Sequence, residues 1–96
     1  MSEKVIAKHI IVEGRVQGVF FRKHTKQKAN ELNIYGWVKN TNDNKVEILA
    51  HGDENDLKEF ISWCKQGPPK AIVKSLLVEE IRIEQVLKEF SIVYDD

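Results

Sequence analysis

The sequence contains little of what marks several other classes of protein. It has one cysteine, Cys64, in 96 residues, so no internal disulfide can form and nothing in the chain requires an oxidising compartment. The longest apolar run near the N-terminus, residues 10–12, is too short for a signal peptide or a membrane span. The three histidines, His9, His24 and His51, do not have the spacing of a metal site. These absences predict a cytoplasmic protein with no metal, no cofactor and no membrane partner.

The chain also lacks an excess of charge of either sign. Lys and Arg total 15, Asp and Glu total 15, and the formal net charge is zero, which argues against nucleic acid as a main partner. Basic residues nevertheless gather between Arg15 and Lys28, a stretch that contains no acid. This run fits either an ordinary solvated surface or a local positive field beside an anion site.

The hydrophobic pattern predicts an α+β domain of alternating strands and helices. Strands are expected at residues 5–13, 34–40 and 45–51, helices at residues 21–32 and after Asp53, an extended run at 72–83 and a possible short strand at 90–94. The order β-α-β-β-α-β favours a ferredoxin-like (split βαβ) sandwich, with two helices on one face of an antiparallel sheet and a possible short fifth strand. A length of 96 residues favours a single domain over 1–96.

The most informative segment runs from the end of the first strand into the first helix. Gly14 and Gly18 let the backbone turn so that its N–H groups converge, and a helix start adds further unpaired N–H groups. Arg22, in the first helical turn, can bind a phosphate with two parallel hydrogen bonds. The spacing matches neither a Walker A loop nor a dinucleotide fingerprint. Taken alone, it fits an anion site or a tight turn whose arginine pairs with a neighbouring acid.

Three segments carry longer patterns than the two glycines and the arginine. They are Val12-x-Gly14-x-Val16-Gln17-Gly18-Val19-x-Phe21-Arg22; Gly36-Trp37-Val38-Lys39-Asn40, followed by Val46 and Gly52; and Gly67-Pro68-Pro69-x-Ala71-x-Val73. The first two resemble the two signatures of the acylphosphatase family, and the third resembles the family's segment after the second helix. One departure is Asn44, where the family pattern usually has glycine. Asparagine accepts a positive φ at modest cost, so we interpret Asn44 as a turn substitution that leaves the chemistry intact.

This resemblance implies a ferredoxin-like fold and hydrolysis of small acyl phosphates to a carboxylate and inorganic phosphate, without metal or cofactor. It implies that Arg22 binds the phosphate and that Asn40 holds the attacking water. The implied phosphate cradle is the loop formed by Arg15, Val16, Gln17, Gly18, Val19, Phe20 and Phe21. Backbone N–H groups fixed by folding stabilise the charge of a transferring phosphoryl group without reorganising. The leaving carboxylate departs without a general acid, which is consistent with the absence of a paired-carboxylate or His/Asp motif.

Other interpretations are weaker on the residues. Cys64 falls on the apolar stripe of the second helix, where a free cysteine acts as a small hydrophobe. His24 lacks the Arg-His-Gly context of histidine phosphatases. An RNA-recognition module shares the element order, but the first and third strands contain no aromatic residue for base stacking.

Three further expectations concern function and context. A non-catalytic module that binds phosphate or acyl phosphate is the main alternative to the enzyme. Similar domains begin larger carbamoyl-phosphate-handling maturation proteins, in which zinc-binding cysteines follow, and the absence of such cysteines here favours a stand-alone protein. Nothing in the pattern indicates an obligate interface, so a monomer is expected.

Overall fold

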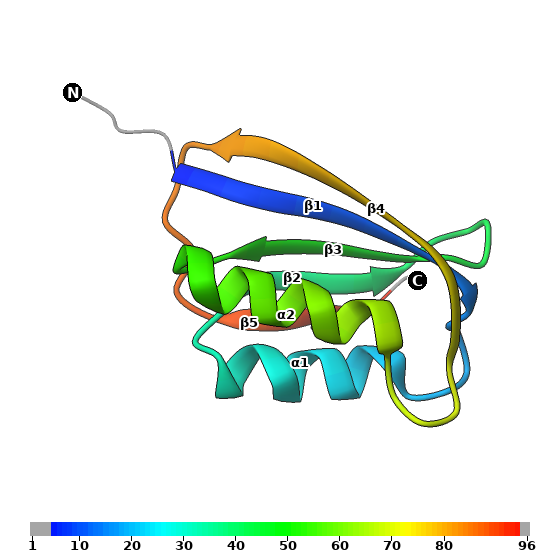
Figure 1. Ribbon diagram of the computed structural model, residues 1–96. Coiled ribbons are helices and arrows are strands. Elements are labelled where there is room, and N and C mark those ends of the chain that lie inside the picture. Colours follow the sequence, from blue (N-terminus) through cyan, green and yellow to red (C-terminus); the bar gives the residue numbers. More distant parts are fainter. Residues whose placement is uncertain (1–4, 95–96) are drawn as a thin grey trace.

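The computed structural model describes residues 5–94, and its seven elements follow the predicted order (Figure 1). These elements are β1 (Val5–Arg15), α1 (Phe21–Glu31), β2 (Tyr35–Asn40), β3 (Val46–His51), α2 (Glu54–Gln66), β4 (Ile72–Ile83) and β5 (Phe90–Val93). The possible fifth strand is therefore confirmed. The predicted boundaries lie close to the observed ones, and Asn33 ends α1 with a φ of 57°, as a left-handed stop does.

The five strands form one open sheet in the order β4-β1-β3-β2-β5. The β4–β1, β1–β3 and β3–β2 pairs are antiparallel, but β5 pairs with β2 in parallel. The sheet is therefore mixed, and the expectation of an antiparallel sheet is corrected at this edge. The chain leaves β4 and crosses along the same end of the sheet to the opposite edge (Figure 1), so β5 must run back against β4 and hence alongside β2.

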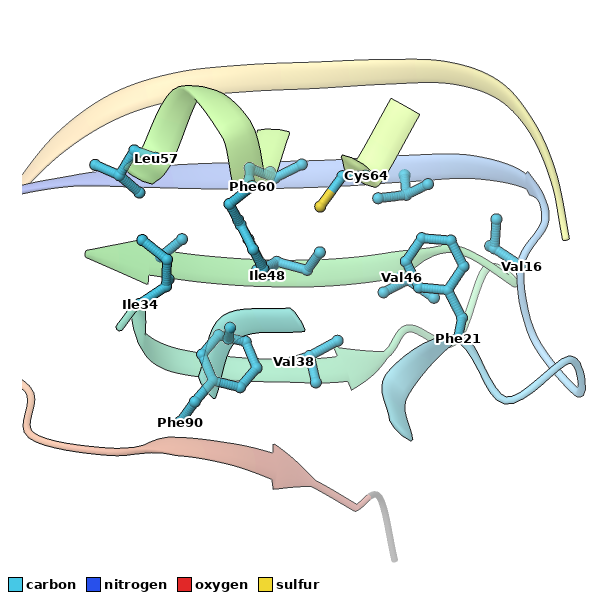
Figure 2. Packing of buried hydrophobic residues seen from close by; sticks show 14 of the residues in the cluster. Val16, Phe21, Ile34, Val38, Val46, Ile48, Leu57, Phe60, Cys64 and Phe90 are labelled. Atoms are coloured by element: carbon cyan, nitrogen blue, oxygen red, sulfur yellow. The ribbon is translucent and has the colours of Figure 1, made fainter. Parts of the chain in front are cut away.

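Both helices lie on one face of the sheet, as predicted, and the core fills the space between these layers (Figure 1). The buried side chains of α1 are Phe21, Thr25 and Ala29. In α2 the buried positions are Leu57, Phe60 and Cys64, and Figure 2 shows them directed toward the sheet. Burying an aromatic or branched aliphatic side chain contributes about 1.5–3 kcal/mol, so this cluster is the main source of stability.

Cys64 belongs to that core. Its side chain is fully buried, and burial raises the pKa of the Cys64 thiol well above its ordinary value. A buried neutral thiol is a poor nucleophile. The interpretation of Cys64 as a packing residue is confirmed.

Gly36, in the second signature, has a steric reason to be glycine. Gly36 lies within β2 at φ 144°, and a Cβ added there would lie 1.8 Å from the carbonyl oxygen of Leu49 on β3. That oxygen belongs to the strand paired with β2, so it cannot move away without breaking the ladder. The β2–β3 hairpin therefore requires glycine at this position.

We expect Gly36→Ala to lower the free energy of unfolding by at least about 3 kcal/mol, because both the positive φ and the backbone clash oppose it. Gly18→Ala is the matched control, since Gly18 also has a positive φ but a Cβ there would meet no atom within 4 Å. That control should cost only about 1–2 kcal/mol. Urea unfolding in phosphate-free buffer measures both, and equal costs for the two variants would contradict the steric explanation.

Candidate active site

The loop after β1 and the end of β2 meet at the same end of the sheet (Figure 1). A pocket of about 390 Å³ opens there. Its lining residues are Val16, Gly18, Phe20, Phe21, Arg22, Lys23, Asn40, Ile92 and Tyr94. The two residues to which the resemblance assigns the chemistry, Arg22 and Asn40, therefore lie in one pocket.

The loop backbone alternates in handedness. Gly18 has φ 74° and Phe20 has φ 62° and ψ 25°, whereas Val19 between them is outside the left-handed region. Successive N–H groups in such an alternation point into one concavity, a geometry that binds anions. Phe20 is a bulky residue in a conformation that costs about 1–2 kcal/mol, a kind of strain that clusters at functional sites.

The amides of this loop and of the helix start bond to no acceptor in the part of the chain that the structure describes. Phe20 is the N-cap of α1 and offers no side-chain cap, and the first bond back from the helix runs from His24 N to Phe20 O at 3.1 Å. Within residues 5–94, no backbone N–H from Gln17 to Lys23 donates to a protein acceptor. Unpaired amides at a helix N-terminus attract an anion, and the helix dipole adds to that attraction.

Arg22 supplies one of two formal positive charges in the pocket wall, and Lys23 supplies the other. Its side chain is half-buried, and its guanidinium carbon lies 5.0 Å from the centroid of the Tyr94 ring. A cation–π attraction holds a guanidinium over an aromatic face. The N–H groups of the guanidinium stay free to donate hydrogen bonds in the plane of the guanidinium. No carboxylate of residues 5–94 forms an ion pair with Arg22. The alternative in which Arg22 only pairs with a neighbouring acid therefore has no support in this part of the chain.

Asn40 is the last residue of β2, where the strand is paired with Val46 of β3. The side chain is half-buried and lines the pocket. An amide offers one acceptor and two donors, which is enough to orient a water but not to deprotonate it strongly.

Three residues of the predicted cradle lie outside the pocket wall: Arg15, Gln17 and Val19. The Val19 side chain is buried in the core, so Val19 can offer the pocket only its backbone. The side chain of Val16, which does line the pocket, is buried too. Arg15 is exposed at the end of β1, where it pairs with Ile72. Gln17 turns its side chain toward the β2–β3 turn, where its Nε2 donates to Thr41 O at 3.0 Å and to Lys45 O at 2.8 Å.

The pocket also includes three residues that the sequence did not single out for it: Lys23, Ile92 and Tyr94. Lys23 belongs to the basic run, and that run was the one available signal for it. Ile92 and Tyr94 come from β5 and the residue just after it, and their place in the wall depends on the parallel pairing of β5 with β2.

The β2–β3 turn contains the departure from the family pattern. Asn44 has φ 65°, so it takes the positive φ that glycine would supply. The interpretation of Asn44 as a turn substitution is confirmed in its geometry.

Residues 5–94 show neither a metal centre nor a membrane-spanning helix. They contain no group of three His, Cys, Asp or Glu side chains placed to hold a metal ion. No helix in this range is long and apolar enough to cross a membrane. The pocket offers amide N–H groups, the Arg22 guanidinium, the Lys23 ammonium and one carboxamide, a set suited to a tetrahedral oxyanion and an adjacent water.

Comparison with known proteins assigns the family. The acylphosphatase family model matches residues 8–92. A curated acylphosphatase from Methylococcus capsulatus is 41% identical over 87 residues, which cover 91% of this chain and 95% of the relative. The crystal structure of acylphosphatase from Bacillus subtilis superposes with a TM-score of 0.89 at 45% identity, covering 93% of this chain and 99% of that one. A structure of full-length HypF has a TM-score of 0.80 at 30% identity, and there the match covers 97% of this chain but 13% of HypF.

The family model spans most of the chain, the relatives align along nearly their whole length, and the pocket lies where the two signatures meet. The chain therefore belongs to the acylphosphatase family and is a hydrolase of that class.

Proposed function

We propose that the amide nest of residues 17–23 and Arg22 bind the phosphoryl group of an acyl phosphate, and that Asn40 orients the attacking water. Within residues 5–94, three features that carry this assignment meet in one pocket: amides that bond to no protein acceptor, an arginine without an acidic partner, and a carboxamide. The nest and the guanidinium hold the tetrahedral oxygens, and the amide of Asn40 lies at the side from which a water can approach phosphorus.

The chemistry needs only these groups. The water oxygen forms a bond to phosphorus while the bond from phosphorus to the acyl oxygen breaks, and the electron pair leaves with the carboxylate. A non-bridging phosphate oxygen takes the proton of the water, so neither a general base nor a general acid is required. Among residues 5–94, no Asp, Glu or His lines the pocket, and this composition fits a carboxylate leaving group better than an alkoxide. Positive groups in place before reaction stabilise the charge on the equatorial oxygens.

We further propose that the domain formed by residues 1–96 works as a monomer in the cytoplasm on small acyl phosphates, without a nucleic acid partner. The zero net charge supports the absence of a nucleic acid partner, and the single buried thiol is compatible with a reducing compartment. Asn40 supports hydrolysis over simple binding, because a module that only holds phosphate needs no group beside the anion to orient a water.

The direct test is release of phosphate from benzoyl phosphate in the presence of a metal chelator. Turnover that continues with chelator supports the proposal. Phosphate binding in a calorimeter without turnover would instead favour the non-catalytic module.

We expect Arg22→Gln to lower kcat/KM by ~10²–10³-fold and to weaken phosphate binding, because one preorganised charged donor is lost from both the ground state and the transition state. Lys26→Gln is the control, since Lys26 is an exposed cation on the same helix that does not line the pocket. If Lys26→Gln reduced activity as much as Arg22→Gln, Arg22 would act through a general positive electrostatic field and not through contact with phosphate.

We expect Asn40→Ala to lower kcat by roughly 10²-fold or more while the inhibition constant for inorganic phosphate stays nearly unchanged, because the variant loses the oriented water and keeps the nest. Steady-state hydrolysis of benzoyl phosphate, with phosphate as competitive inhibitor, measures both quantities. A parallel loss of phosphate binding would show that Asn40 holds the anion and not the water.

A further inference from the structure

The side chain of Gln17 makes contacts that the proposed chemistry does not use. Gln17 belongs to the phosphate loop, but its side chain does not line the pocket. The Nε2 atom instead donates to two carbonyl oxygens of another segment, Thr41 O at 3.0 Å and Lys45 O at 2.8 Å. A carboxamide nitrogen has two hydrogens, so both bonds can form at once.

The two acceptors flank Asn40. Thr41 follows Asn40 directly in the chain, and Lys45 directly precedes Val46, the residue paired with Asn40 across the hairpin. Gln17 therefore holds both strands of the β2–β3 hairpin at the point immediately beyond Asn40. The contact joins the loop that provides the amide nest to the strand end that provides the carboxamide.

The turn that Gln17 contacts also has hydrogen bonds of its own. Thr41 N donates to Lys45 O at 2.9 Å, and Lys45 N donates to the Thr41 hydroxyl at 2.9 Å. The Lys45 ammonium lies 3.2 Å from Glu13 and 3.4 Å from Asp43, and these carboxylates raise the pKa of Lys45. A turn with this many internal bonds moves as a unit, so fixing it at two carbonyls also fixes Asn40.

We propose that Gln17 is a positioning residue that sets the distance between the amide nest and the Asn40 carboxamide. This inference rests on the roles proposed above for the nest and for Asn40. Without the two bonds, the nest and Arg22 still bind phosphate, because their geometry comes from the loop and from α1. The Asn40 side chain then no longer holds water in line with the bond that breaks.

The test is a double-mutant cycle between Gln17→Met and Asn40→Ala. In the wild-type background Gln17→Met should lower kcat by roughly 10–100-fold, because a misplacement of about 1 Å has an effect of that size. The inhibition constant for inorganic phosphate should change much less. In the Asn40→Ala background Gln17→Met should cause almost no further loss, because the residue through which it acts is gone.

Two further variants separate positioning from general destabilisation. Gln17→Lys keeps N–H donors directed at the two carbonyls and should recover most of kcat, whereas Gln17→Glu places an acceptor against them and should be as impaired as Gln17→Met. Gln27→Met is the matched control, because Gln27 is exposed on α1, and it should leave kcat unchanged. The Lys and Glu variants keep the proposal testable if Gln17→Met does not fold.

The outcomes distinguish this proposal from the proposed function. Equal losses from Gln17→Met in the two backgrounds, or a Gln17→Lys variant as poor as Gln17→Glu, would overturn the positioning role alone. An Asn40→Ala variant with wild-type kcat would contradict the role of Asn40, and the positioning role would be overturned with it.

Discussion

The site depends on a row of backbone N–H groups that have no acceptor among residues 5–94. Leaving such donors unsatisfied is unfavourable, and the strained conformation of Phe20 adds to the cost. The loop nevertheless stays in place because it alternates between anchored and free positions: Val16, Val19 and Phe21 are buried in the core, whereas Phe20 is 65% exposed. The hydrophobic core thus holds open a concavity that the loop would not keep alone, and an anion can satisfy the donors.

The topology brings the second half of the site to the first. β1 and β2 run in the same direction with β3 between them, so both end at the same side of the sheet, and Asn40 comes beside the loop that follows β1 (Figure 1). The parallel pairing of β5 adds Ile92 and Tyr94 to the wall, and Tyr94 lies against the Arg22 guanidinium. The two bonds from Gln17 then tie the loop to the hairpin. Each contact joins segments that are far apart in the chain.

This separation explains which features the sequence could predict. Local signals were sufficient for the strands and helices, for the Asp53 cap of α2, whose side chain accepts from Asn55 N, and for the positive φ of Asn44. Long-range features could not be predicted from the sequence. The parallel pairing of β5, the contact of Tyr94 with Arg22 and the direction of the Gln17 side chain all depend on packing between distant segments. The resemblance assigned Gln17 to the cradle by its position in the loop, but position alone gives no information about the contacts of a side chain.

We infer that the nest exists before the anion arrives. Crystal structures of the protein with and without inorganic phosphate test this preorganisation. We predict phosphate within hydrogen-bond distance of backbone nitrogens of the nest, residues 17–23, and of the Arg22 guanidinium, with the loop backbone unchanged between the two structures. Amides that turn inward to protein carbonyls in the phosphate-free crystal, or phosphate bound away from this loop, would contradict it.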